Sequence, residues 1–458
     1  MKKLSALLFA LTSSLFACSQ EAQPDTTNDN VVDAIDSTEL LPSLHPIAKF
    51  TSMQTGQVEV QPSLNFNKWN AQQVGHVDLS NLKGSDATLR MIAVGGGLTA
   101  GVCNGGLYRE SQQFAYPNLV AHQMGLTDFE MPLFSEQDFN GTGYYLYDNP
   151  LAKYPKWKKV INNRAPVTGG APPVLPRYEG NASNFATPWG ASTWLSYPYC
   201  EKCMTQPYVS RLSTLKATPQ YNVLSEILEK RPYNFVLLDD FFDRWIQGLQ
   251  ENSHINHYTL NFNGSIYLSG TITDYTLNAI LGKGQRGVIF TVPHYRTLPY
   301  MNWYKVSELI GASTNSDASY LVPSPFVSRI FEKHEPGSKF TSKLDPLSVI
   351  DAEEALFSDP ETMYNPKIKE YAEKHNLAVV DLYEVYEKIH TGSYVSDDGV
   401  PIDGTMKGNF FSADGIYPTA LGQAIIANET IKAINEKYHT RIPLISIKDF
   451  VKTIGFKN

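Results

Sequence analysis

Short apolar runs that alternate with helical patterns narrow the fold of this chain more than any other feature. From Leu89 onward, runs with the length of a buried strand each neighbour a stretch whose apolar residues recur at helical spacing. The expected strands are Leu89–Val94, Phe235–Leu238, Gly287–Val292 and Leu377–Val380, and the expected helices are Tyr116–Met124, Val223–Leu228, Leu277–Leu281, Ile368–Lys374 and Thr419–Tyr438. This alternation predicts an α/β fold whose sheet is mainly parallel and carries helices on both faces.

The length of the chain leaves room for more than this core. Its 458 residues, of which 42% are hydrophobic, exceed what one minimal domain needs. We expect one α/β domain over residues 61–458 with two irregular insertions, at about 128–219 and 294–362. The first insertion is rich in Tyr, Pro, Trp and Gly, and we expect it to pack over one end of the sheet.

The first residues have the layout of an export signal. Lys2 and Lys3 precede an apolar stretch, Leu4–Phe16, which is too short to span a bilayer and leads to Cys18. We therefore expect a signal peptide over residues 1–17 and a Cys18 that carries lipid such as palmitate. An ordinary secretory signal with an incidental cysteine is the alternative.

The residues after Cys18 bear on location. Ser19, in place of Asp, favours transfer to the outer membrane by the usual sorting rule for such lipoproteins. Residues 18–60 are expected to form a flexible tether, because Glu21 to about Leu40 is acidic and lacks aromatic residues. No later run approaches the roughly 18 apolar residues of a membrane span, so the lipid would be the anchor, on either face of the outer membrane.

Charge and cysteine content limit the partners and cofactors. The net charge is −8, and no strong cluster of Lys and Arg suits a phosphate backbone, so nucleic acid is not an expected partner. Cys200 and Cys203 could form a local disulfide, a redox pair or half of a metal site; export favours the disulfide and leaves Cys103 unexplained. We expect no cofactor and no metal ion.

Two turns lie where ligands bind in such sheets, beyond the carboxyl ends of the strands. The first strand runs into Gly95–Gly101 (GGGLTAG), and the last helix follows Asp414–Pro418 (DGIYP). Both turns resemble blocks of the SGNH (GDSL-type) hydrolase family, Gly-Asp-Ser-Leu-Thr-x-Gly and Asp-x-x-His-Pro, and the wider sequence is similar to a branch of exported lipoproteins described as GDSL lipases. The resemblance runs from about Leu89 to the C-terminus, with gaps at the insertions, and implies a flavodoxin-like three-layer α/β/α sandwich.

The family's catalytic positions hold other residues here. By this alignment, Gly96 replaces the family's Asp, Gly97 replaces the nucleophilic Ser and Tyr417 replaces the His base, while Asp414 is retained. Glycine has no side chain to acylate, and a phenol with a pKa of about 10 is a poor base at neutral pH.

The family's oxyanion-binding residues are also altered or not identified. Asp243 aligns approximately with an Asn that helps to bind the oxyanion, and its carboxylate would repel the developing negative charge. The Gly that completes this site in the family should lie between Tyr199 and Leu215.

The resemblance and these substitutions together imply a pseudoenzyme. We expect no catalytic residue but a binding or scaffolding role in a complex with an integral outer-membrane protein or other lipoproteins. A candidate ligand pocket would be lined by Gly96, Gly97, Asp239, Asp240, Asp243, Asp414 and Tyr417. A solvated strand end or a helix cap explains Asp239 and Asp240 equally well.

Two other functions stay open. An active GDSL-type esterase or lipase would need another nucleophile, for which Thr99, Ser111 and Cys103 are candidates. A metal-binding protein would use the acidic cluster or the pair Cys200 and Cys203.

Overall fold

The computed structural model describes parts of the second of two compact units, Met1–Asp33 and Ala34–Asn458. The described residues are 54–148, 157–167, 175–188, 195, 207–212, 222–247, 272–282, 284–302, 320–321, 350–351 and 360–457. The expected signal peptide, Cys18 and most of the expected tether lie outside them, as do Cys200 and Cys203.

A four-stranded parallel sheet forms the centre of the described fold. Its strands, in spatial order, are β2 (Met91–Gly95), β5 (Phe235–Asp239), β6 (Arg286–Phe290) and β9 (Ala378–Val380). Each coincides with an expected strand to within two residues, because each is a short, mainly apolar and mainly buried run. The predicted α/β fold with a parallel sheet is confirmed.

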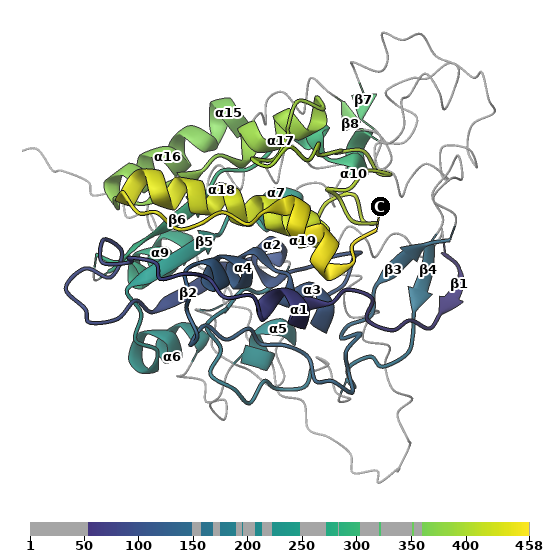
Figure 1. Ribbon diagram of the computed structural model, residues 1–458, viewed down its shortest axis with the longest axis horizontal. Helices are drawn as coiled ribbons and strands as arrows, with labels where there is room; N and C mark the ends of the chain where they lie inside the picture. The colour runs from purple at the N-terminus through teal and green to yellow at the C-terminus, as the bar shows by residue number, and fades with distance from the viewer. Residues whose placement is uncertain are drawn as a thin grey trace, which may run out of the picture. The chain divides into compact units, whose positions relative to one another are not determined.

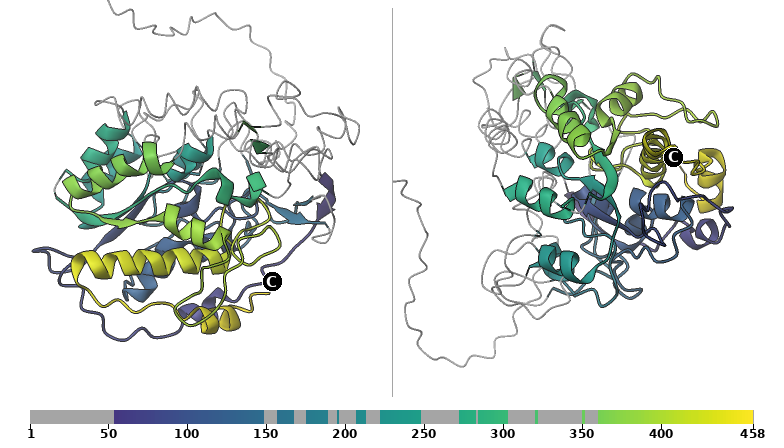
Figure 2. Two further views of the ribbon diagram at one scale, coloured as in Figure 1. Left: turned by 90° about the horizontal axis from the view of Figure 1, so that it is seen from above. Right: turned by 90° about the vertical axis from the view of Figure 1, so that its left-hand side faces the viewer.

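Helices cover both faces of this sheet (Figures 1 and 2). On one face α18 (Ala420–Tyr438) packs against α4 (Tyr116–Gln123), and on the other lie α6 (Val223–Lys230), α9 (Ile272–Ile280) and α16 (Asn365–Lys374). The sequence predicted all five. Thr419 caps α18, because its hydroxyl accepts a hydrogen bond from the Gly422 N–H at 3.1 Å.

The remaining elements are short. They are α1 (Phe66–Asn70), α2 (Gly97–Ala100), α3 (Arg109–Gln113), α5 (Pro207–Leu212), α7 (Phe242–Gln247), the 3-10 helix η3 (Tyr295–Thr297), α10 (Pro299–Asn302), β7 (Tyr320–Leu321), β8 (Ile350–Asp351), α15 (Pro360–Met363), α17 (Leu382–His390) and α19 (Ile447–Ile454). Of these, α2 and α7 follow β2 and β5 directly, so they begin where the two strands deliver the chain to the candidate site.

A second, three-stranded sheet lies outside the central one. It has the order β1 (Gln54–Val58), β4 (Trp157–Val160), β3 (Tyr145–Tyr147), with β1 parallel and β3 antiparallel to β4. The described fold therefore includes residues before 61, where the folded domain was expected to begin. A hydrogen bond from the Trp157 indole to the Ala413 carbonyl at 3.0 Å joins this sheet, most of it from the first insertion, to the turn before α18.

One extended segment of the first insertion lies along the free edge of β2. The Ala93 N–H donates to the Ser183 carbonyl at 2.9 Å, and the N–H groups of Phe185 and Thr187 donate to Ala93 and Gly95 at 2.7 and 2.9 Å. These bonds follow the pattern of a parallel strand pair. The insertion thus brings Thr187 to the carboxyl end of β2.

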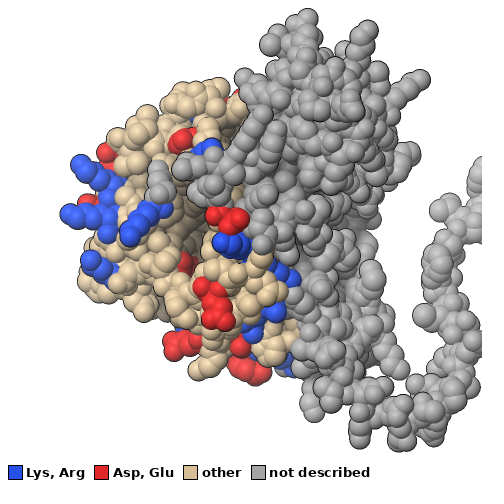
Figure 3. Space-filling view, turned by 90° about the vertical axis from the view of Figure 1, so that its right-hand side faces the viewer, with Lys and Arg blue, Asp and Glu red and all other residues tan. Residues whose placement is uncertain are grey.

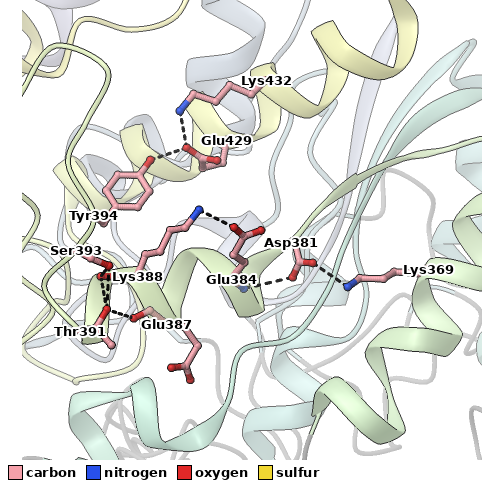
Figure 4. A network of polar contacts seen from close by, with 10 residues as sticks. All are labelled: Lys369, Asp381, Glu384, Glu387, Lys388, Thr391, Ser393, Tyr394, Glu429 and Lys432. Atoms are coloured by element: carbon pink, nitrogen blue, oxygen red, sulfur yellow. Dashed lines mark hydrogen bonds and ion pairs between the residues drawn. The ribbon is translucent and has the colours of Figure 1, made fainter.

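A network of polar side chains at the surface includes residues of α16, α17 and α18, near the edge strand β9 (Figure 4). Lys369 on α16 contacts Asp381 at 2.9 Å, and Asp381 caps α17 by accepting from the Glu384 N–H at 3.4 Å. On α18, the Glu429 carboxylate accepts from the Tyr394 hydroxyl at 2.5 Å and contacts Lys432 at 2.8 Å. These carboxylates all have cations or hydroxyls beside them at the protein surface.

Candidate functional site

The two strand-end turns and the start of α18 meet at the carboxyl end of the sheet. Gly95 and Asp239, the last residues of β2 and β5, are register partners. A Cβ built on Gly97 would lie 2.8 Å from three atoms of the Tyr417 side chain, and one built on Gly96 would lie 2.3 Å from the Asp243 Cγ. Positions 97 and 417, which the resemblance assigns to the nucleophile and its base, therefore lie next to each other in the structure.

Asp243 connects these positions through both of its carboxylate oxygens. Its Oδ2 accepts a hydrogen bond from the Gly97 backbone N–H at 2.7 Å, and its Oδ1 accepts one from the Tyr417 hydroxyl at 2.8 Å. Burial raises the pKa of Tyr417, and the neighbouring Asp243 raises it further, so the phenol keeps its proton and acts as the donor. We call Gly97, Asp243 and Tyr417 the bridged triplet.

The bridged triplet explains why both glycines are small. Real Cβ atoms are essentially never found closer than 3.0 Å to another heavy atom, so a side chain at position 96 or 97 would displace Asp243 or the Tyr417 ring. The Tyr417 ring thus occupies the space into which a side chain at position 97 would point. Asp243 is 2% exposed and Tyr417 is fully buried, so the contact is also closed to solvent.

Asp414 holds the turn that carries Tyr417. Its Oδ1 accepts from the backbone N–H groups of Ile416 and Tyr417, both at 2.8 Å, and its Oδ2 accepts from the Gly105 N–H at 2.9 Å. Burial raises the pKa of Asp414 to about 6, although these hydrogen bonds favour its charged form. These hydrogen bonds hold the turn before α18 against the backbone at Gly105.

Asp239 and Asp240, at the end of β5, are each 1% exposed, which excludes the solvated strand end that the sequence allowed. The Asp239 Oδ2 accepts from the Thr99 hydroxyl at 3.1 Å, and the Thr99 oxygen lies 2.9 Å from the Tyr116 hydroxyl. Burial, with Asp243 nearby, raises the pKa of Asp239 to about 8. At neutral pH this carboxyl is mostly protonated, which lowers the cost of holding several acids together without water.

All seven residues of the expected ligand pocket are brought together, and all are buried. The sequence did not predict that their side chains would fill the space between them. A cleft of about 930 Å³ lies elsewhere, beside α4, and includes Phe66, His122, Tyr178 and Arg211 in its lining but none of the seven.

The three alternative nucleophiles lie in different surroundings. Thr99 is fully buried in α2 and held by Asp239 and Tyr116. The Ser111 hydroxyl is committed to the start of α3, where it donates to the Tyr108 carbonyl at 2.9 Å. Burial raises the pKa of the Cys103 thiol to about 12, so the thiolate that would attack an ester is scarce at neutral pH.

The region expected to supply an oxyanion Gly is only partly described. Of residues 199–215, the structure describes 207–212, which form helix α5. The segment that actually runs beside β2 is Ser183–Thr187. Sequence reasoning missed it because an apolar run as short as Phe185–Ala186 before Thr187 and Pro188 has too few residues to show a strand period.

Among the described residues, no three His, Cys, Asp or Glu side chains are grouped so that they could hold a metal ion. Within the same residues, no helix is long and apolar enough to cross a bilayer.

Comparisons with known proteins give no relative for this chain: no model of a protein family, no curated protein and no solved structure matches it.

Proposed function

We propose that this chain is a catalytically inactive, SGNH-hydrolase-like lipoprotein that acts as a binding or scaffolding subunit at the outer membrane. The observation that carries the proposal is the bridged triplet. Asp243 links the Gly97 N–H to the Tyr417 hydroxyl at the position where the resemblance places a nucleophile and its base.

Three requirements of ester hydrolysis are missing from this arrangement. The residue at position 97 has no hydroxyl, the residue at 417 is a protonated phenol, and the Gly97 N–H already donates to a carboxylate and cannot serve an oxyanion. Loss of one member of a catalytic triad typically costs about 10⁴-fold or more in rate. We therefore expect hydrolysis at this site to be negligible.

The alternative of an esterase with another nucleophile gains little from the geometry. Thr99 and Ser111 are buried and hydrogen-bonded within the fold, and Cys103 titrates far above neutral pH. The seven residues of the expected pocket are buried, so we place a binding role at a described cleft instead. The cleft beside α4 supplies half-buried aromatic rings, Phe66 and Tyr178, together with the exposed Arg177.

A reactivity assay tests the catalytic half of the proposal. We expect the purified full chain to give no adduct with a fluorophosphonate probe and no turnover of a p-nitrophenyl ester above the buffer rate. Thr99→Ala and Cys103→Ala should leave that baseline unchanged. Strong labelling or turnover that disappears in one of these variants would show that the chain is an active esterase.

A pull-down tests the scaffolding half. The full chain should be recovered from its native membrane, in gentle detergent, together with a stoichiometric partner. Recovery of the chain alone, under conditions that keep other membrane complexes intact, would contradict the scaffolding role. This result does not depend on whether the chain is active, so the two halves fail separately.

A further inference from the structure

The surface formed by α1 and α19 carries basic side chains in a protein whose net charge is −8. Helix α1 packs against α19 through the Trp69 and Phe450 rings, whose centroids are 5.4 Å apart. Four exposed lysines belong to these helices and the residues after them, and we call them the α19 patch: Lys68, Lys448, Lys452 and Lys457.

The α19 patch has two acids beside its four lysines: Asp449 on α19, and Asp398, whose Oδ2 accepts a hydrogen bond from the Lys448 N–H at 2.8 Å. None of the ion pairs between described residues involves its four lysines. Asp449 is the single acidic residue between Ile447 and Lys457. Figure 3, which views the side to the right in Figure 1, shows basic side chains gathered along one edge of the described surface.

A hollow lies between the two helices. It measures about 420 Å³, and its lining includes Lys68 from α1 and both Asp449 and Lys452 from α19. Val451 and Phe456 are partly exposed beside the lysines. Lysines interleaved with partly exposed apolar side chains are typical of surfaces that rest on a bilayer.

The chain passes beside this patch just before α1 begins. The Asn65 N–H donates to the Ile454 carbonyl at 2.9 Å, which joins the segment between β1 and α1 to the end of α19.

We infer that the α19 patch docks on the anionic phospholipid surface of the membrane that holds the chain, and so orients the protein there. The inference rests on the lipid anchor of the proposed function, but not on the absence of catalysis. Each lysine near an anionic bilayer contributes roughly a fivefold gain in binding, and an acyl chain alone anchors a protein only weakly. A weak patch suffices because the anchor keeps it close to the lipid.

Lysine footprinting on the full chain tests this orientation. The chain is mixed with vesicles of phosphatidylglycerol and phosphatidylethanolamine, or of phosphatidylcholine alone, and treated with an amine-reactive reagent before mass spectrometry. We expect the four lysines to react about fivefold more slowly on the anionic vesicles. Lys374 and Lys437, exposed on α16 and α18, should react equally on both.

Matched variants separate docking from general attraction. In K448Q/K452Q, Lys68 and Lys457 should regain their reactivity on anionic vesicles, whereas in K374Q/K437Q, which removes the same charge, they should stay protected. Equal reactivity of the patch on both kinds of vesicle would overturn the inference, as would equal protection of all lysines. Because vesicles can also be added to a chain that carries no lipid, a failed anchor and a failed patch give different results.

Discussion

Carboxylates in this molecule occur in two contrasting settings, and the contrast shows how burial changes their chemistry. In the cluster at the carboxyl end of the sheet, burial raises the pKa of Asp239 to about 8 and that of Asp414 to about 6. At the surface, partial burial of Asp398 is outweighed by hydrogen bonds from Ser396, the Lys448 N–H and Ser446, which lower its pKa. At neutral pH the buried Asp239 is thus mostly neutral, whereas Asp398 at the surface is charged.

The two settings differ in how strongly each carboxyl group depends on the hydrogen-bond donors around it. Surface carboxylates exchange freely with water and contribute little to stability, even in a network such as that of Figure 4. The buried acids have shed their water, so each depends on the few donors around it. Three measurable effects should distinguish the buried cluster from the surface carboxyl groups.

The largest expected effect is the dependence of stability on pH. The pKa of Asp239 is raised from its unfolded value of 3.8 to about 8, so between these pH values the folded state holds a proton that the unfolded state releases. The free energy of unfolding should fall by several kcal/mol as pH rises from about 4 to about 8, at roughly 1.4 kcal/mol per pKa unit. Denaturant titrations across this range measure it.

Two variants assign that pH dependence. Asp239→Asn removes the titrating group and should flatten the fall. Asp398→Asn should leave it unchanged and act in the opposite range, because a lowered pKa stabilises the fold above the unfolded value and that stability is lost as pH falls through the folded pKa. An unaltered slope in Asp239→Asn would mean that this carboxyl is not held neutral.

The next effect concerns packing. In Gly97→Ala the new methyl group would lie 2.8 Å from the Tyr417 ring, and we expect a loss of about 2–3 kcal/mol in the free energy of unfolding. Gly75→Ala is the control, since nothing lies within 4 Å of its Cβ position. Combining Gly97→Ala with Tyr417→Ala should give less than the sum of the two single losses. Additive losses would show that the two positions do not touch.

The smallest expected effect is the stability lost when one tyrosine hydroxyl is removed in each setting. Tyr417→Phe removes a donor from the buried Asp243 and should cost about 2 kcal/mol, because a buried carboxylate loses one of its hydrogen bonds. Tyr394→Phe removes the hydroxyl that donates to Glu429, which also contacts Lys432, and should cost about 0.5–1 kcal/mol. Thermal unfolding should show a larger loss of stability in Tyr417→Phe than in Tyr394→Phe. A larger loss in Tyr394→Phe would contradict the expected difference between buried and surface hydroxyl groups.

The sequence predicted the central fold because its strands are apolar on both faces and its helices have regular spacing. The resemblance, and not the periodicity, is what placed Gly97 opposite Tyr417. The sequence missed β1 and the segment at Ser183–Thr187, which are short and owe their extended form to pairing partners far along the chain.

The closure of the candidate site could not be predicted in the same way. The sequence suggested that the Asp243 carboxylate would face a pocket and repel negative charge. Instead it accepts hydrogen bonds from Gly97 and Tyr417, an outcome that depends on the angle at which α7 leaves β5. The lysines of the α19 patch also escaped notice, because Lys68 is nearly 400 positions from Lys448 and only the packing of α1 on α19 joins them.

The wide separation of the partners of Asp243 has a consequence for the order of folding. Its two hydrogen bonds span 146 and 174 residues, and the second requires the turn just before the final long helix. Closing such long loops is slow, so the acids at the end of β5 stay hydrated until nearly the whole polypeptide has been made. The heart of the molecule is therefore completed last, by the part of the chain that emerges last.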